Sequence, residues 1–148
     1  MTYLFDVNVL IAVADPAHVF HESIHNWLAS HQISQWATCP LTENGFIRIL
    51  SQPAYRGTRC STQDAILLLR EMKLSTKRRH VFWPDSVSLT DLETLHLERI
   101  AGPAQITDIY LAALALRNKG KLVTFDQAIP WQAIVNAKPS VLSIPVSN

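Results

Sequence analysis

The segment Thr107–Asp126, TDIYLAALALRNKGKLVTFD, joins a helical pattern directly to a strand-like one and decides the fold class. Its first half repeats apolar side chains at the spacing of one helix face, at Ile109, Ala112, Ala113 and Leu116. Gly120 follows this stripe, and glycine is the usual residue just past a helix end. Lys121–Thr124 is then a short apolar run that predicts a strand. A helix that returns at once to a strand is typical of α/β domains.

The rest of the chain repeats this alternation of strands and helices. Further strands are predicted at Tyr3–Phe5, Gln35–Thr38, His80–Trp83 and Val141–Ile144. Amphipathic helical patterns cover Val19–Ser30 and Leu41–Leu50. Alternating strands and helices predict a three-layer α/β sandwich around a central, mainly parallel five-stranded sheet. We expect residues 1–148 to form a single domain.

Two polar pairs predict helix starts in the middle of the chain. Ser61 stands three residues before Asp64 and precedes an apolar helical run, which makes it a candidate N-cap. Thr90 and Glu93 have the capping-box spacing and stand beside Leu92, Leu95 and Leu97. We therefore expect one helix after Ser61 and another after Thr90.

Composition excludes several classes of protein. The chain has 148 residues and a net charge of +1, whereas domains that coat nucleic acid by bulk electrostatics are usually strongly basic. No apolar run approaches the roughly 20 residues that a membrane helix needs. Cys39 and Cys60 match no metal-binding or disulfide pattern. We expect a cytoplasmic protein that makes no membrane contact and keeps both thiols reduced.

Four acidic residues stand at predicted element boundaries: Asp6, Glu43, Asp108 and Asp126. Taken singly, each has an ordinary explanation, because carboxylates favour helix N-termini. Taken together, they would meet at the carboxyl edge of a parallel sheet, where such folds bind their ligands. Carboxylates that converge near a buried strand end repel one another, and a divalent cation relieves that repulsion. The pattern predicts a metal site formed by these four acids.

Hard oxygen ligands favour Mg²⁺ or Mn²⁺, and the scarcity of Cys and of His at strand ends disfavours zinc. Asn8 adds a neutral oxygen close to Asp6, and the hydroxyls of Thr107 and Thr124 could orient a carboxylate or a water. Helix capping and strand propensity explain the two threonines equally well. His18, His21 and His25 recur along one predicted helix, but no further ligand completes a metal site there. We interpret that histidine stripe as a polar helix surface or a partner contact.

The ordered pattern Asp6-x-Asn8, Glu43, Thr107-Asp108-x-Tyr110 and Thr124-Phe125-Asp126 resembles that of the PIN-domain ribonucleases. The resemblance is closest to the toxins of VapBC-type toxin–antitoxin pairs and spans nearly the whole chain. Segments between the acids also match, at Phe46–Pro53 and Phe82–Asp85.

The resemblance implies a Mg²⁺- or Mn²⁺-dependent endoribonuclease in which Asp6, Glu43, Asp108 and Asp126 coordinate metal. A metal-activated water would then cut RNA to leave 5′-phosphate and 3′-hydroxyl ends. It also implies an antitoxin that covers the acidic site with a basic segment, and a homodimer. Candidate contacts to RNA phosphates are Arg48, Arg56, Arg59, Lys77, Arg78 and Arg79, although a solvated basic surface explains them as well.

Two other functions stay open from the sequence. Asp6-x-Asn8 after the first strand also resembles haloacid-dehalogenase phosphotransferases, but Asn8 stands where that class needs a general acid. A non-catalytic PIN-like module could instead bind a basic partner in its acidic pocket. Helix faces bearing Trp27, Phe46 and Ile47 would offer a groove for a partner helix or a homodimer surface, or simply pack into the core.

Overall fold

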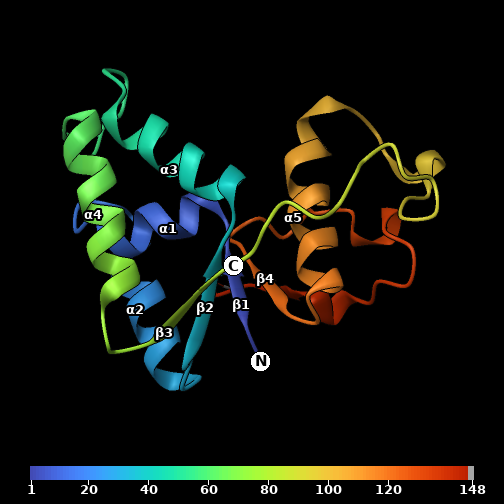
Figure 1. Cartoon of the computed structure of the whole chain (residues 1–148), viewed down its shortest axis with the longest axis horizontal. Coiled ribbons are helices and arrows are strands. Elements are labelled where there is room, and N and C mark those ends of the chain that lie inside the picture. Colours follow the sequence, from blue (N-terminus) through green and yellow to red (C-terminus); the bar gives the residue numbers. More distant parts are fainter. Residues whose placement is uncertain (147–148) are drawn as a thin grey trace.

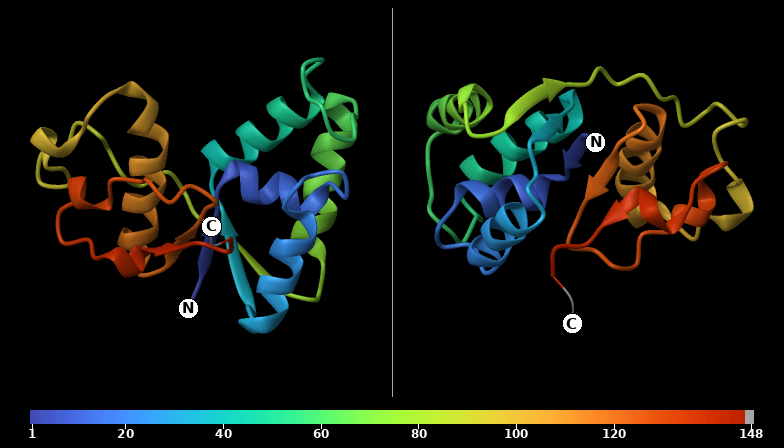
Figure 2. Two further views of the ribbon diagram at one scale, coloured as in Figure 1. Left: turned by 180° about the vertical axis from the view of Figure 1, so that it is seen from behind. Right: turned by 90° about the horizontal axis from the view of Figure 1, so that it is seen from below.

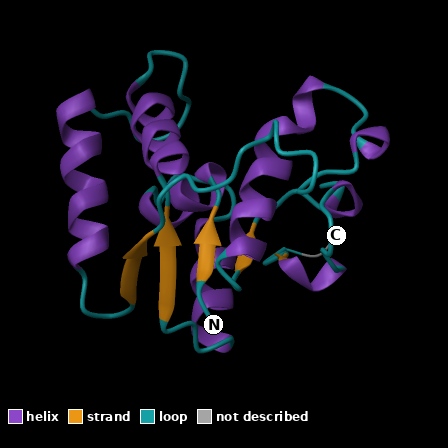
Figure 3. Ribbon diagram, turned by 45° about the vertical axis from the view of Figure 1, so that its right-hand side comes forward, coloured by secondary structure: helices purple, strands orange, loops and turns teal. Residues whose placement is uncertain are grey.

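A parallel sheet of five short strands forms the centre of the molecule in the computed structural model, which describes residues 1–146. The strands are β1 (Tyr3–Phe5), β2 (Gln35–Thr38), β3 (Arg79–Phe82), β4 (Lys121–Val123) and β5 (Leu142–Ser143), in the order β3-β2-β1-β4-β5. All four neighbouring pairs are parallel, so the strands end at one common edge (Figure 3). The sheet confirms the predicted fold class.

The chain reverses its direction across the sheet between β1 and β4. It winds from β1 to β2 and β3 on one side, then crosses to β4 and β5 on the other. Phe5 pairs with Val123 at the ends of these two central strands. Ligand sites of open α/β sheets lie at such a switch point, outside the carboxyl ends of the strands.

Four helices cover one face of the sheet: α1 (Val7–Ala14), α2 (His21–Ser30), α3 (Pro40–Ser51) and α4 (Thr62–Leu74) (Figure 1). Their apolar sides bury Leu10, Ile24 and Phe46 completely. Ser61 caps α4 by accepting a hydrogen bond from the Asp64 backbone N–H, as predicted. Phe46 is core rather than groove, while Trp27 and Ile47 are partly buried against the same core.

The opposite face is covered by α5 (Ile106–Arg117) and by the irregular C-terminal segment (Figure 2). Every residue from Ile109 to Ala115 is buried, so this helix is enclosed on nearly all sides. Short 3-10 turns at Trp131–Ala133 and Pro139–Val141 pack around it. The buried surface of α5 is therefore wider than the single apolar face predicted from the sequence.

The helix predicted after Thr90 does not form, and the prediction was wrong. Thr90 bonds the hydroxyl of Ser88 instead of opening a helix, with 2.8 Å between the two oxygens. Leu95 pairs with Ile134 in an isolated antiparallel bridge. Leu92 is 66% exposed, so the apolar spacing there builds no helical face. Two 3-10 turns, Leu97–Arg99 and Pro103–Gln105, follow before α5.

Smaller differences concern element ends. Strand β3 begins one residue before the predicted His80, and β4 and β5 are shorter than predicted. Helix α2 begins at His21 instead of Val19. After α5 the left-handed residue is Lys119, with φ of 56°, and not Gly120. Gly120 is required for another reason, because a Cβ there would lie 2.5 Å from the Thr2 carbonyl oxygen.

Among residues 1–146, no helix is both long and apolar enough to cross a lipid bilayer. Both cysteines are free thiols, and Cys39 is buried in the core.

Candidate functional site

Asp6 lies at the switch point, directly after β1 and at the N-cap of α1. Its backbone N–H donates to Val123 O at 3.1 Å, which ties it to the end of β4. Its Oδ1 accepts a hydrogen bond from Val9 N–H at 2.8 Å. The carboxyl group is therefore buried and held in one orientation at the carboxyl edge.

The surroundings of Asp6 disfavour its charged form. Burial raises the pKa of Asp6 to about 6, although hydrogen bonds from Thr124 and Val9 act in the opposite direction. The negative charges of Asp108 and Asp126 raise the same pKa further. The charges of both other aspartates therefore act on the Asp6 carboxyl group.

Asp126 and Asp108 reach this position from the other half of the fold. The Asp126 backbone N–H donates to Thr124 Oγ1 at 3.1 Å, so this hydroxyl orients the loop after β4 as well as the carboxylate of Asp6. Asp108 stands in the first turn of α5. Burial and the charge of Asp126 raise the pKa of Asp108. Thr107, next to it, is exposed.

The three aspartates supply the oxygen ligands that a hard divalent cation prefers, and a bound positive charge would offset the repulsion among their carboxylates. Within residues 1–146, however, no three His, Cys, Asp or Glu side chains are arranged so that they could hold one ion by themselves. Mg²⁺ is commonly bound by one or two carboxylates and several waters. The residues therefore fit a partly hydrated ion rather than a closed protein cage.

Glu43 follows β2 at the same edge but takes part in a different cluster. Its Oε2 accepts hydrogen bonds from Lys73 Nζ at 2.8 Å and from Thr38 Oγ1 at 2.6 Å. His80 Nε2 lies 2.8 Å from the same Thr38 oxygen. Because the Thr38 proton points to Glu43, the imidazole must be the donor in that contact. Burial and the nearby Lys73 ammonium lower the pKa of His80 to about 4, so the ring is neutral.

Thr38 and Lys73 thus engage Glu43, and no hydrogen bond or salt bridge within residues 1–146 joins it to the three aspartates. Both hydrogen bonds go to Oε2, which leaves Oε1 available at the carboxyl edge. The sequence pattern did not identify Lys73 or His80, because each lies on a later element and meets Glu43 only in the folded sheet.

The side-chain oxygen of Asn8 is engaged by His18 and is not free to join the aspartates as a metal ligand. Its Oδ1 lies 2.8 Å from His18 Nε2, while His18 Nδ1 accepts a hydrogen bond from the Phe20 backbone N–H at 3.0 Å. With Nδ1 as an acceptor, Nε2 must carry the proton and donate it to Asn8. Burial lowers the pKa of His18, which agrees with a neutral ring. Asn8 therefore presents its NH₂ group to the surroundings.

The other two histidines of the stripe contact the end of α1. His21 Nδ1 lies 2.7 Å from Ala12 O, and His25 Nε2 lies 3.0 Å from Val13 O. Both rings satisfy carbonyl groups that a helix C-terminus leaves free. They join α2 to α1 within the fold.

Asp15, which the sequence did not single out, is a buried carboxylate at the C-cap of α1. It accepts hydrogen bonds from Tyr55 Oη and from Thr58 N–H at 2.9 Å, both in the α3–α4 connection. Burial acts to raise the pKa of Asp15, but these bonds and that from Ala17 N–H outweigh it and hold the pKa at about 2. This aspartate is a structural clamp.

Comparison with known proteins agrees with this geometry. The sequence model of the PIN domain matches residues 3–133, which include all four candidate acids and four of the five strands. The chain belongs to the PIN domain family.

Curated PIN-domain relatives show which branch this is. Ribonuclease VapC44 of Mycobacterium tuberculosis (strain ATCC 25618 / H37Rv) is 42% identical over 137 residues, covering 93% of this chain and 94% of the relative. Ribonuclease VapC39 of the same strain is 39% identical over 129 residues, covering 87% and 91%. The chain is thus a VapC-type PIN domain.

Solved structures of two other proteins share the PIN fold. The crystal structure of M. tuberculosis VapC20, described as a toxin that cleaves the sarcin-ricin loop, aligns with a TM-score of 0.54 at 15% identity over 93% of this chain and 99% of that one. VapBC2 from Rickettsia felis, bound to a promoter DNA fragment, aligns with a TM-score of 0.56 at 14% identity over 97% and 98%. At such identities the likeness concerns the fold alone.

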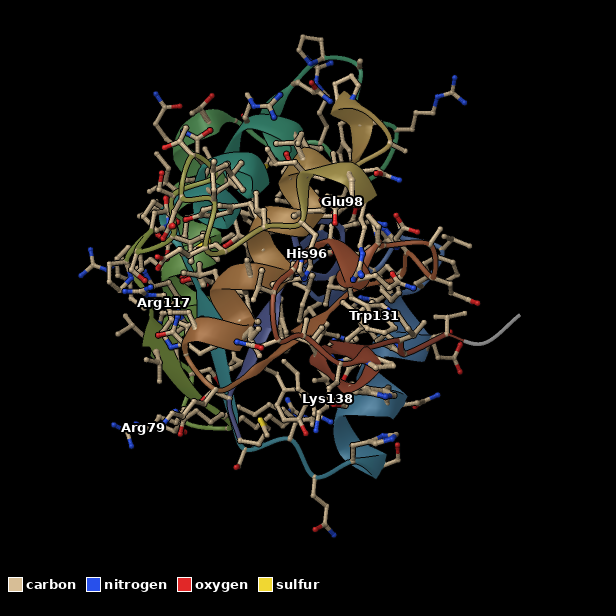
Figure 4. All side chains as sticks on the ribbon, turned by 90° about the vertical axis from the view of Figure 1, so that its right-hand side faces the viewer. Arg79, His96, Glu98, Arg117, Trp131 and Lys138 are labelled. Atoms are coloured by element: carbon tan, nitrogen blue, oxygen red, sulfur yellow. The ribbon has the colours of Figure 1, made fainter. Side chains whose placement is uncertain are left out.

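The candidate basic residues of this PIN domain lie in two places. Arg79 begins β3, so Lys77, Arg78 and Arg79 lie at the amino edge, opposite the aspartates; Arg79 projects outward at the lower edge in Figure 4. Arg78 donates its Nε–H to Ile33 O at 3.1 Å. Arg48 is in the last turn of α3, and Arg56 and Arg59 are exposed in the connection that follows it (Figure 1). Only this second group lies on the carboxyl side of the sheet.

Proposed function

We propose that this chain is a Mg²⁺- or Mn²⁺-dependent endoribonuclease and acts in the cytoplasm as the toxin of a toxin–antitoxin pair. The observation that carries the proposal is that Asp6 and Asp126 follow strands that end at the switch point of the sheet, with Asp108 in the first turn of α5. There the charges of Asp108 and Asp126 raise the pKa of Asp6, and the charge of Asp126 raises the pKa of Asp108. The identity to proteins named Ribonuclease VapC supports the choice of RNA as substrate.

The three aspartates would hold the ion, with Glu43 at the rim of the same edge. When bound, such a cation lowers the pKa of a water molecule and neutralises charge on the scissile phosphate. Thr124 keeps the Asp6 carboxylate oriented and anchors the backbone of Asp126. Asn8 directs an NH₂ group outward, where it can donate a hydrogen bond to a phosphate oxygen.

Arg48, Arg56 and Arg59 are better placed than Lys77, Arg78 and Arg79 to hold phosphates that flank the cut. They lie on the carboxyl side, whereas Lys77, Arg78 and Arg79 lie at the amino edge, where β3 begins. Such contacts position the RNA but do not select its sequence.

An antitoxin that inserts a basic segment at the aspartates is part of the same proposal. A guanidinium group that bonds two carboxylate oxygens neutralises the carboxylates as a metal cation does. It would therefore exclude the metal ion. The VapBC2 assembly of Rickettsia felis supports an antitoxin partner. A homodimer also belongs to the proposal and is tested by sedimentation of the purified chain.

The test is incubation of the purified protein with total cellular RNA in Mg²⁺, Mn²⁺ or chelator, followed by mapping of the cut ends. We expect cuts only with metal, and 5′-phosphate and 3′-hydroxyl ends. Ends that carry a 2′,3′-cyclic phosphate would overturn the metal-activated water, because they require attack by the 2′-hydroxyl. Release of phosphate from small phosphomonoesters without RNA cleavage would favour the phosphotransferase alternative.

A further inference from the structure

Three aromatic rings gather beside the aspartates, and we call them the aromatic shelf: His18, Phe20 and Phe125. The Phe20 and Phe125 ring centroids are 4.6 Å apart, and the His18 centroid lies 5.9 Å from that of Phe20 and 6.2 Å from that of Phe125. The His18 and Phe125 ring planes are inclined by only 31°. The rings come from the α1–α2 connection and from the loop after β4, so the shelf exists only in the folded protein.

The shelf borders the proposed catalytic centre on two sides. Phe125 stands in the chain between Thr124, which orients Asp6, and Asp126 itself. His18 bonds Asn8 in the first turn of the helix that Asp6 caps. A group resting on the shelf is therefore adjacent to a phosphate held at the aspartates.

The position of the shelf is fixed before any ligand arrives. Both ring nitrogens of His18 are engaged, Nε2 with Asn8 and Nδ1 with the Phe20 backbone N–H. The connection is also fastened at its start, because Asp15 accepts from Ala17 N–H at 2.9 Å and from the α3–α4 connection. A neutral imidazole with both nitrogens occupied is suited to stacking rather than to proton transfer.

The shelf is also accessible. All three rings are partly exposed, and Phe20 and Phe125 pack against the core on their other side. Between His18 and Phe20, Val19 is 82% exposed, although large apolar side chains usually avoid such exposure. The shelf is therefore open to a flat apolar group from solution.

We propose that the aromatic shelf stacks one unpaired RNA base next to the scissile phosphate and is the subsite for that base. The inference rests on the proposed ribonuclease function and adds the binding mode of the substrate. An unpaired base is the occupant that fits, because proteins bind such bases by stacking them on aromatic side chains. The adjoining Asn8 amide and the aspartates suit the phosphate of the same nucleotide.

The test pairs a change in the shelf with a change in the RNA. The probe is a short single-stranded RNA that spans a cut site mapped in total RNA, made either intact or with one flanking nucleotide abasic. Phe125→Leu keeps the apolar packing and removes the aromatic face. For the intact RNA we expect KM to rise at least about fivefold and kcat to change less than about twofold, since lost stacking weakens ground-state binding.

The abasic RNA shows whether the lost contact is with a base. At one of the two flanking positions, removing the base should weaken binding to the wild-type protein as much as Phe125→Leu does. Combining both changes should then add little further loss. Equal weakening of intact and abasic RNA at both positions by Phe125→Leu would overturn the proposal, because the ring would then contact the backbone.

Matched variants separate stacking from folding. Phe125→Tyr keeps an aromatic face and should restore wild-type KM. Trp27 and His31 form another stacked pair, with ring centroids 4.8 Å apart. The pair lies at the C-terminal end of α2, where Trp27 contacts Tyr3 at the amino end of β1. Trp27→Leu should leave KM within about twofold of wild type. A failed rescue by tyrosine, or an equal effect of Trp27→Leu, would contradict the shelf.

The experiment distinguishes the absence of base stacking on the shelf from the absence of ribonuclease activity. If the wild-type protein cuts RNA and Phe125→Leu has the same KM, base stacking on the shelf is refuted and the ribonuclease function stands. If no RNA is cut under any metal condition, both fail together.

Discussion

Asp6 has two roles with opposing energetics. As the N-cap of α1 it stabilises the helix by accepting from Val9 N–H, but as a buried carboxylate beside Asp108 and Asp126 it destabilises the metal-free fold. Asparagine caps a helix as well as aspartate does and carries no charge. A substitution can therefore separate the two roles.

We predict that Asp6→Asn abolishes metal-dependent cleavage and leaves the metal-free fold equally or more stable. The gain is at most about 3 kcal/mol at pH 7.5, because the pKa of Asp6 is raised to about 6 from 3.8. Urea unfolding in chelator measures it. Asp6→Ala also removes the charge but cannot cap, so it should be about 1 kcal/mol less stable than Asp6→Asn. A loss above about 1 kcal/mol in Asp6→Asn would mean that the charge is needed for folding.

Asp15 makes the opposite contribution to stability. Its folded pKa of about 2 lies below the unfolded value of 3.8, so the folded state binds the proton less tightly. The stabilisation is complete above about pH 5 and is lost as the pH falls through 4 towards 2, amounting to about 2 kcal/mol. Urea unfolding of Asp15→Asn should show this part of the acid dependence removed. Asp91→Asn, at an exposed turn, should retain it.

Sequence reasoning finds aspartates that follow strands and misses those paired across the fold. Asp6 and Asp126 end apolar runs, and the sheet then brings them together. Asp15 is buried because Tyr55 and Thr58, far along the chain, bond it. The engagement of Glu43 by Lys73 has the same long-range origin.

The connection between α3 and α4 is the element whose position depends most on close packing. It carries Arg56 and Arg59 and is bound to Asp15 through Tyr55 and Thr58. Gly57 packs closely against this contact, because an added Cβ would lie 2.2 Å from Asp15 Oδ2 and 2.6 Å from Tyr55 Oη. We predict that Gly57→Ala destabilises the fold by about 1–3 kcal/mol through this overlap. Gly102→Ala is the control, because its Cβ would meet no atom within 4 Å. Equal unfolding midpoints for the two variants would contradict the clamp.

At the scale of elements, the sequence predicts the sheet well and residues 84–105 poorly. Strands of a parallel sheet are short buried runs between helices, and each predicted strand end lies within one residue of the observed end. The Thr90–Glu93 signal failed because Ser88 competes locally for Thr90, and Leu95 contacts Ile134 from the C-terminal segment. Local capping signals carry no information on such distant contacts.

Charge is unevenly distributed over the whole molecule. The three aspartates lie at the carboxyl edge, while Lys77, Arg78 and Arg79 lie where β3 begins, so a net charge of +1 conceals a polar distribution. Repulsion among the aspartates is a cost of the metal-free state, and a divalent cation removes it. We therefore propose that this edge of the sheet binds a divalent cation.

Manganese binding, measured by calorimetry on the wild-type protein and on Asp108→Asn, tests this claim most directly. Asp64→Asn is the matched control, because Asp64 is also an acid in the first turn of a helix but on α4, which no strand precedes directly. We predict that Asp108→Asn weakens Mn²⁺ binding at least about tenfold and that Asp64→Asn leaves it unchanged. Wild-type affinity for Mn²⁺ in Asp108→Asn would contradict the account.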